Sequence, residues 1–277
     1  MAFTAYIHWI GCLLFAVASF IAVLAQTATQ HARVELLARQ ASVTPGSDAQ
    51  LGVHFMLEKG WHIYWINPGD SGQPPSFKWQ LPQGFTAGEI QWPRPERMQP
   101  TKELVDYGYH DDVLLPLTIH TPPSVTDTKP IELGVEVKWL ICREVCIPEH
   151  AELRLSLPVA ATVSADPQHE PLFARTTKLL PQPLPRTWKA SVAAGKDEFL
   201  LTIRAGKAIT EAQFFPLDPG QIDNAAQQNF QPLHTGATLT LKKSDQLLKP
   251  ITLLRGVLVI PGSPAYWIEA PVRQSIQ

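Results

Sequence analysis

Two cysteines, Cys142 and Cys146, lie four positions apart in "KWLICREVCIPEH", residues 138–150. Two thiols this close can form a structural disulfide, bind a soft metal such as Cu(I), or exchange disulfides with other proteins. The residue types alone leave these three hypotheses open.

Metal binding would need further ligands beside the two thiolates. His62, His110 and His150 are candidates, but no second C-x-x-C or H-x-x-x-H pair in the sequence indicates a structural zinc site. Soft thiolate ligands would favour Cu(I), with Cys142 and Cys146 as its ligands. We therefore predict no dedicated metal site and keep Cu(I) binding by the two thiols as an alternative.

The segment before the cysteines alternates like a β-strand. One face carries Leu133, Val135, Val137, Trp139 and Ile141. Strict alternation places Cys142 on the opposite face, which is mostly polar, so we expect its side chain to be accessible.

The spacing of the pair requires a turn. Four extended residues span about 13 Å, whereas a disulfide requires Cα atoms within about 7 Å. The chain must therefore turn through residues 143–145 and return into "AELRLSLP", residues 151–158. This predicts a pair at the tip of a hairpin, within reach of a partner thiol. Arg143 could stabilise a thiolate there and Glu144 would oppose it.

The rest of the chain also alternates with period two and predicts an all-β protein. Prolines, glycines, asparagines and aspartates separate the predicted strands, as is typical of β-sandwiches. The predicted strands are 51–58, 113–120, 152–158, 198–204, 237–243 and 256–262.

Composition and pattern divide the chain into two β domains. We predict two immunoglobulin-like β-sandwiches in tandem, at 31–160 and 186–277, joined by a linker at 161–185 with one short helix around 170–180. The second domain carries no cysteine and no catalytic constellation. We therefore expect it to serve as a scaffold or to dock partners.

The N-terminus predicts export. Residues 10–25 are almost wholly apolar and end in "VLA", which suits a signal peptide spanning 1–25. The alternative is an uncleaved membrane anchor. Removal of the signal would leave only Cys142 and Cys146 in an oxidising compartment, where disulfides persist. The net charge of −2 excludes a broad electrostatic attraction for nucleic acid.

Four motifs occur in order and together resemble one known family. They are "GWHIYWINPGDSGQPPSFKW" (60–79), "WPRPERM" (92–98), "VDYGYHDDVLLPLTI" (105–119) and "VEVKWLICREVCIPEHAELRLSLP" (135–158). They resemble the periplasmic N-terminal domain of the DsbD and ScsB thiol:disulfide interchange proteins. The stretch "FFPLDPGQIDNAAQQNF" (214–230) is similar to the second sandwich domain of the ScsB-like branch. The C-x3-C spacing of Cys142 and Cys146 also resembles that branch more than DsbD proper, where the spacing is longer.

The resemblance implies a function. Cys142 and Cys146 match the redox pair of the family, with Cys146 as the nucleophile, Cys142 as its resolving partner and no other cofactor. The implied partners are a thioredoxin-like or membrane electron-transfer protein and periplasmic proteins that carry disulfides. Within these 277 residues no multi-pass membrane domain or thioredoxin-like C-x-x-C module follows. We therefore expect the electron donor to act in trans.

The resemblance also implies a cap over the pair. In the family a loop with an acidic residue and an aromatic residue shields the cysteines, and the matching stretch here nominates Asp106, Tyr107 and Tyr109. The strand that matches "WHIYW" nominates His62 and Tyr64 as flanking residues. The family context further suggests cytochrome c biogenesis or copper tolerance as the biological setting.

Overall fold

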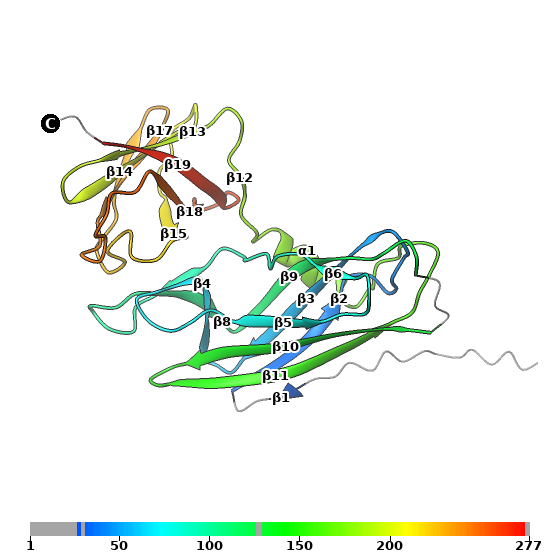
Figure 1. Ribbon diagram of the computed structural model, residues 1–277. Coiled ribbons are helices and arrows are strands. Elements are labelled where there is room, and N and C mark those ends of the chain that lie inside the picture. Colours follow the sequence, from blue (N-terminus) through cyan, green and yellow to red (C-terminus); the bar gives the residue numbers. More distant parts are fainter. Residues whose placement is uncertain (1–26, 29–30, 126–128, 275–277) are drawn as a thin grey trace, which may run out of the picture.

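The computed structural model describes residues 27–28, 31–125 and 129–274. The chain forms two β domains joined by a segment that carries one helix (Figure 1). This confirms the predicted all-β fold class with immunoglobulin-like sandwich domains. The predicted signal peptide lies outside the described residues. No helix in the described part of the chain is long and apolar enough to cross a membrane.

The first domain contains two antiparallel sheets. One has the strand order β1-β2-β3-β9-β6, and the other has the order β11-β10-β4-β8-β7, with β5 paired to β10. The strands of the first sheet are β1 (Thr27–Ala28), β2 (Ala32–Ala38), β3 (Asp48–Leu57), β9 (Asp112–His120) and β6 (Thr86–Ala87). Those of the second are β11 (Cys146–Leu157), β10 (Ile131–Cys142), β4 (His62–Gly69), β8 (Asp106–His110), β7 (Glu96–Met98) and β5 (Ser76–Gln80).

The core of this domain lies between the two sheets. Val53 and Phe55 of β3 are buried, as are Val137 and Trp139 of β10 on the facing sheet. Phe55 and Trp139 meet edge to face with ring centroids 5.4 Å apart. The period-two pattern therefore identifies the inward faces of both strands, because successive side chains of a strand point to opposite sides.

The second domain is built around one long strand. Its sheet has the order β15-β18-β19-β13-β14-β17-β16, and β12 pairs with β19 outside this path. The first residues of β19 pair with β18 and its last three pair with β13, so the strand joins the two halves around a separate core. The bounds are β12 (Gln182–Pro183), β13 (Lys189–Ala194), β14 (Glu198–Arg204), β15 (Gln213–Pro216), β16 (Asn229–Leu233), β17 (Gly236–Lys242), β18 (Leu253–Val259) and β19 (Tyr266–Gln274).

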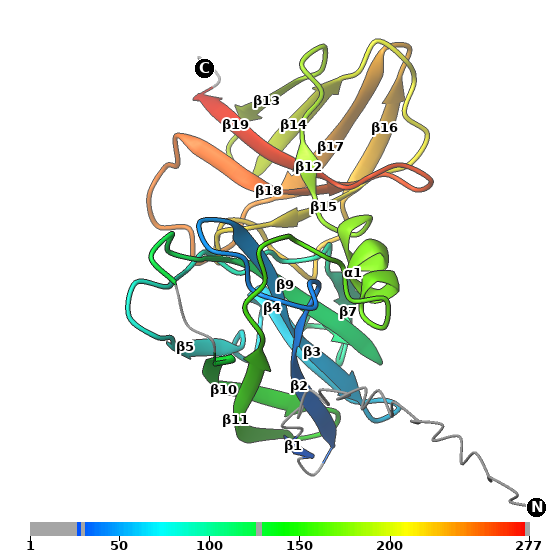
Figure 2. The same cartoon turned by 90° about the vertical axis from the view of Figure 1, so that its right-hand side faces the viewer.

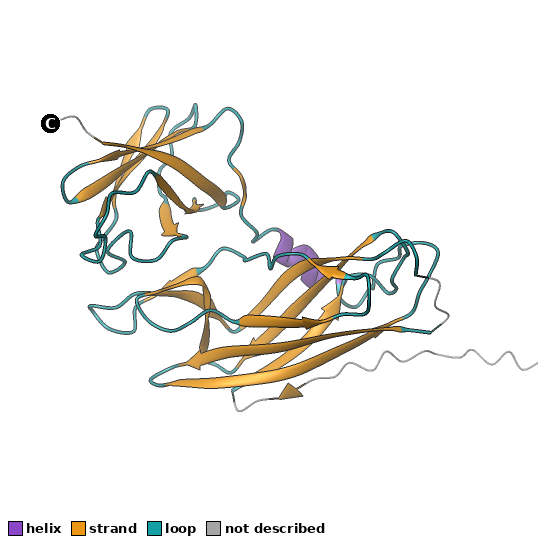
Figure 3. Cartoon of the chain, viewed as in Figure 1, coloured by secondary structure: helices purple, strands orange, loops and turns teal. Residues whose placement is uncertain are grey.

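The linker helix packs onto the first domain. Helix α1 (Glu170–Thr177) begins with a proline in its first turn, where the missing N–H costs nothing. Figures 2 and 3 show it beside β9, as the only helical ribbon among the described residues. Phe173 is buried against Leu37 and Leu114, so the helix is anchored to the outer face of the first sheet.

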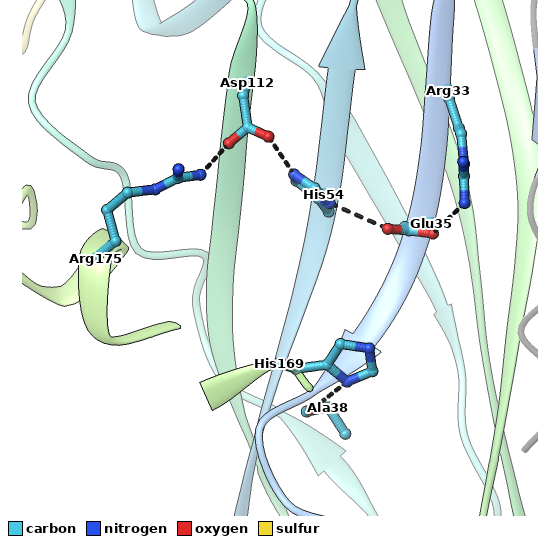
Figure 4. A network of polar contacts seen from close by, with 7 residues as sticks. All are labelled: Arg33, Glu35, Ala38, His54, Asp112, His169 and Arg175. Carbon is cyan, nitrogen blue, oxygen red and sulfur yellow. Dashed lines mark hydrogen bonds and ion pairs between the residues drawn. The ribbon is translucent and has the colours of Figure 1, made fainter. Parts of the chain in front are cut away.

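A row of charges also holds α1 to the sheet (Figure 4). His54, on β3, contacts Glu35 at 3.1 Å and Asp112 at 2.8 Å, and Arg175 of α1 donates to the same Asp112. Burial disfavours a charge on the imidazole. Hydrogen bonds to both carboxylates outweigh this effect and raise the pKa of His54 above its usual value.

The two domains contact each other beside β4 and β8. Phe215 of β15 meets Tyr107 of β8 edge to face at 5.3 Å. Asn67 donates a hydrogen bond to the carbonyl of Pro216 at 2.7 Å. Tyr107 donates to the side chain of Asn224 at 3.1 Å. The contact is therefore both apolar and polar, and it lies on the sheet that carries the cysteines.

Candidate functional site

The cysteines close the end of a long β-hairpin. Strands β10 and β11 pair over twelve positions, and Cys142 opposite Cys146 is the last pair. The two residues are joined by a disulfide, with Cα atoms 4.1 Å apart. Within the tip, the N–H of Arg143 donates to the carbonyl of Val145. The predicted turn through residues 143–145 is confirmed.

The two sulfurs lie in different environments. Cys142 is buried, with 2% of its surface exposed, whereas Cys146 is exposed. Val145, next to it at the tip, is 64% exposed. The prediction that Cys142 is accessible is therefore wrong. It does lie on the polar face of β10, but residues from the neighbouring strand β4 cover that end of the face.

Tyr64 of β4 covers the disulfide directly. Its hydroxyl donates to Sγ of Cys142 at 3.0 Å and lies 3.4 Å from Sγ of Cys146. Tyr64 is itself 1% exposed. Burial raises the pKa of the Tyr64 hydroxyl, so the group stays protonated at neutral pH and can donate to sulfur.

His62 lies beside Cys142 on the same face. It is the cross-strand partner of Cys142 on one side and of His110 on the other, and antiparallel partners share a face. The ring of His62 is buried, and its Nε2 has no hydrogen-bond partner among the residues that the structure describes. Burial, reinforced by the nearby His110, lowers the pKa of His62 to about 4. A neutral imidazole therefore flanks Cys142 at neutral pH.

A glycine-containing segment, residues 69–75, covers Tyr64 in turn. Gly72 has φ +74°, and a Cβ built there would lie 2.1 Å from Cζ of the Tyr64 ring. Only glycine therefore allows this backbone to lie against the ring. Ser71 anchors the segment, because its N–H and its hydroxyl both donate to the carboxylate of Asp106 at 2.8–3.0 Å. We call residues 69–75 the covering segment.

The family resemblance nominated a different stretch, residues 105–112, for the cap. The nominated stretch forms strand β8 rather than a loop. The Tyr107 hydroxyl donates to Asn224, and the Tyr109 hydroxyl donates to the carbonyl of Pro93 at 2.8 Å. The structure therefore does not place Tyr107 or Tyr109 over the sulfurs. Asp106 is buried and contributes indirectly, by holding Ser71 of the covering segment.

The turn signal "NPGDSGQPP", residues 67–75, could have located the covering segment, but in the sequence it indicates only a loop. The sequence pattern does not show that β4 pairs with β10, and this pairing brings Tyr64 onto the disulfide.

The two residues nominated to tune the thiolate lie at the exposed tip. The guanidinium of Arg143 lies 5.1 Å from the centroid of the Trp61 ring, and Trp61 stacks on His31 at 3.8 Å. Glu144 is exposed. Their effect on the cysteines stays a prediction.

Metal ligands are not assembled here. Among the described residues, no group of three or more histidine, cysteine, aspartate or glutamate side chains is placed to hold a metal ion. The two cysteines are bonded to each other. Cu(I) binding by the reduced pair, and activity without a cofactor, both stay predictions.

These features describe a β-sandwich protein with a disulfide at a hairpin tip, where Cys146 is exposed and Cys142 is buried under Tyr64. Residues 33–158 match the family described as thiol:disulfide interchange protein DsbD, N-terminal. This match lies within the first domain and confirms the predicted resemblance to the DsbD/ScsB N-terminal domain.

A solved structure resembles both domains. The crystal structure of the N-terminal periplasmic domain of ScsB from Proteus mirabilis matches with a TM-score of 0.68 and 17% sequence identity. The match covers 90% of this chain and 98% of that chain. At this identity it shows a shared fold that extends over the second domain. No curated protein matches the sequence.

Proposed function

We propose that this protein passes electrons between proteins by thiol–disulfide exchange at Cys142 and Cys146. The observation that carries the proposal is the unequal exposure of two bonded cysteines at a hairpin tip, in a domain that matches a thiol:disulfide interchange family. The exposed Cys146 can form a mixed disulfide with a partner sulfur. The buried Cys142 can then attack Cys146 and resolve that mixed disulfide.

The exchange has two balanced steps. In the reduced protein, the thiolate of Cys146 attacks one sulfur of a partner disulfide. A mixed disulfide forms and the other partner sulfur leaves as a thiolate. The thiolate of Cys142 then attacks Sγ of Cys146, which restores the Cys142–Cys146 bond and releases the second partner sulfur. Two electrons pass to the partner, and the two protons of the original thiols protonate its new thiols. The steps run in reverse when a donor dithiol reduces the pair.

Two neighbouring side chains support these steps. Cys142 must lose its proton before it attacks, and the neutral imidazole of His62 lies on the same face, with an Nε2 that no described residue contacts by a hydrogen bond. With a pKa of about 4, His62 is too weak a base to take the thiol proton, so we assign it the role of a neutral hydrogen-bond donor to the Cys142 thiolate. The Tyr64 hydroxyl, 3.0 Å from Sγ of Cys142, is placed to donate a hydrogen bond to a thiolate.

We place this reaction in the periplasm, with partners that carry thioredoxin-like or other redox-active disulfides. The family assignment of residues 33–158 and the likeness to a periplasmic domain support this location. The exposed Val145 beside Cys146 supports docking of a protein partner at the tip.

The test is the trapping of the mixed disulfide. The Cys142→Ser variant, incubated with an oxidised thioredoxin-like protein, should accumulate a covalent adduct that dithiothreitol dissolves. The matched Cys146→Ser variant keeps only the buried thiol and should accumulate far less. Equal trapping by both variants, or none by Cys142→Ser while Cys146 reacts with an alkylating agent, would contradict the proposal.

A further inference from the structure

The second domain contacts the covering segment through one buried side chain. Asn224 is 8% exposed, and its Nδ2 donates to Oδ1 of Asp70 at 2.7 Å. Its Oδ1 accepts from the hydroxyl of Tyr107 at 3.1 Å, and its backbone carbonyl accepts from Arg97 at 3.3 Å. A carboxylate can only accept hydrogen bonds, so the amide orientation of Asn224 is fixed by its two partners.

Asp70 belongs to the covering segment and is held at several points. Its backbone N–H donates to the carbonyl of Val105 at 2.9 Å, and its Oδ2 accepts from the N–H of Val105 at 2.8 Å. Two residues further along, Gly72 lies against the Tyr64 ring. A continuous series of contacts therefore runs from Asn224 through Asp70 and Gly72 to Tyr64 and the disulfide.

A second contact fixes the start of the same segment. Asn67 is 1% exposed, donates to the carbonyl of Pro216 in the second domain, and accepts from the N–H of Gly69 at 3.1 Å. The second domain thus holds both ends of residues 67–70. The first domain alone supplies the anchor between Ser71 and Asp106.

We propose that the second domain positions the cover of the redox pair, with Asn224 as the positioning residue that holds the covering segment and, through it, Tyr64 over the sulfurs. This inference deepens the proposed exchange function and gives the cysteine-free second domain a role in it. Loss of the Asn224 contact removes one of the three hydrogen bonds that hold Asp70, so the covering segment opens more often and Tyr64 leaves the disulfide more often.

The experiment measures how fast a small reductant reaches the disulfide. The oxidised full chain is mixed with excess dithiothreitol, and the rate of reduction is followed for wild type and for Asn224→Ala. We expect reduction to accelerate by about fivefold or more, the lower end of coupling between sites in proteins. Hydrogen exchange at the amides of residues 69–75 should accelerate in the same variant.

Two controls separate positioning from general destabilisation. Asn229→Ala removes an exposed asparagine of the same domain, and its reduction rate should equal that of wild type. Ile203→Val trims the buried core of the second domain; it should lower thermal stability without changing the rate. If Asn224→Ala does not fold, Asn224→Asp, which keeps the side-chain size and removes the donor, decides by the same measurement.

The outcomes are distinct. A folded Asn224 variant that is reduced at the wild-type rate, or an Ile203→Val variant that accelerates as much, would overturn the inference. Either result leaves the proposed exchange standing, because it concerns only the cover. Failure to trap a mixed disulfide would reject the exchange function and leave this comparison intact, because dithiothreitol reduces the disulfide without a protein partner.

Discussion

Removal of the Tyr64 hydroxyl should change the reactivity of the reduced pair. Tyr64→Phe keeps the ring against the covering segment and deletes only the donor that lies 3.0 Å from Cys142 and 3.4 Å from Cys146. The hydroxyl stabilises a thiolate more than a thiol, because hydrogen bonds to charged groups are the stronger ones. The variant should therefore raise the pKa of both cysteine thiols, and the assay follows the exposed Cys146.

The magnitude follows from the strength of the bond. Hydrogen bonds to charged groups contribute about 1.5–3 kcal/mol, and a sulfur acceptor argues for about 1.5 kcal/mol. One pKa unit corresponds to about 1.4 kcal/mol, so the pKa should rise by about one unit. The thiolate fraction near neutral pH then falls about tenfold. The greater nucleophilicity of the more basic thiolate recovers part of this, so attack slows about three- to fourfold.

The assay is alkylation of the reduced protein by iodoacetamide as a function of pH. Exposed Cys146 should dominate the rate, and the midpoint of the profile gives the pKa. Tyr109→Phe is the matched control, because it deletes a buried hydroxyl that donates to the carbonyl of Pro93 instead. Coincident profiles for wild type and Tyr64→Phe, with both proteins folded, would refute this account of Tyr64.

Three further predictions concern the groups around the site and the helix. The pKa of His54 is raised in the folded protein, so its contribution to stability is complete below about pH 6.5 and is lost as the pH rises through the pKa of the folded state. Denaturant titrations as a function of pH should show this loss, and the His54→Gln variant should not show it. Gly72→Ala should lower the free energy of unfolding by about 1–3 kcal/mol more than Gly206→Ala does. Both glycines have positive φ, but only an alanine at position 72 brings a Cβ against the Tyr64 ring. Stopped-flow kinetics of His62→Leu should show a mixed disulfide that persists longer than in wild type, because the Cys142 thiolate loses a neutral hydrogen-bond donor. Resolution at the wild-type rate would exclude that role.

The sequence predicted the hairpin because its evidence is local. Alternation over residues 131–142 and the distance limit of a disulfide together require a turn between the cysteines, and the structure has that turn. The same alternation gave the wrong exposure for Cys142, because burial of a polar strand face depends on what the adjacent strands bring to it. No spacing in the chain shows that β4 lies beside β10.

The cap assignment shows the same limit. The aromatic and acidic residues of "VDYGYHDD" suit a cap by type, but β8 pairs with β4 and directs Tyr107 toward the second domain. The covering segment, by contrast, contains no aromatic residue and acts through the absence of a side chain at Gly72. Likewise, the contact between Asn224 and Asp70 joins residues 154 positions apart, a separation that no local pattern encodes.

The twelve-rung ladder that ends in the disulfide has one more consequence. The backbone around the cysteines is fixed by main-chain pairing, which does not depend on whether the sulfurs are joined. Reduction or oxidation of the cysteine pair should leave the backbone of the hairpin almost unchanged. A partner protein therefore cannot distinguish the two oxidation states from the overall shape of the domain. It must distinguish them by contact with the cysteines and their neighbours at the tip of the hairpin.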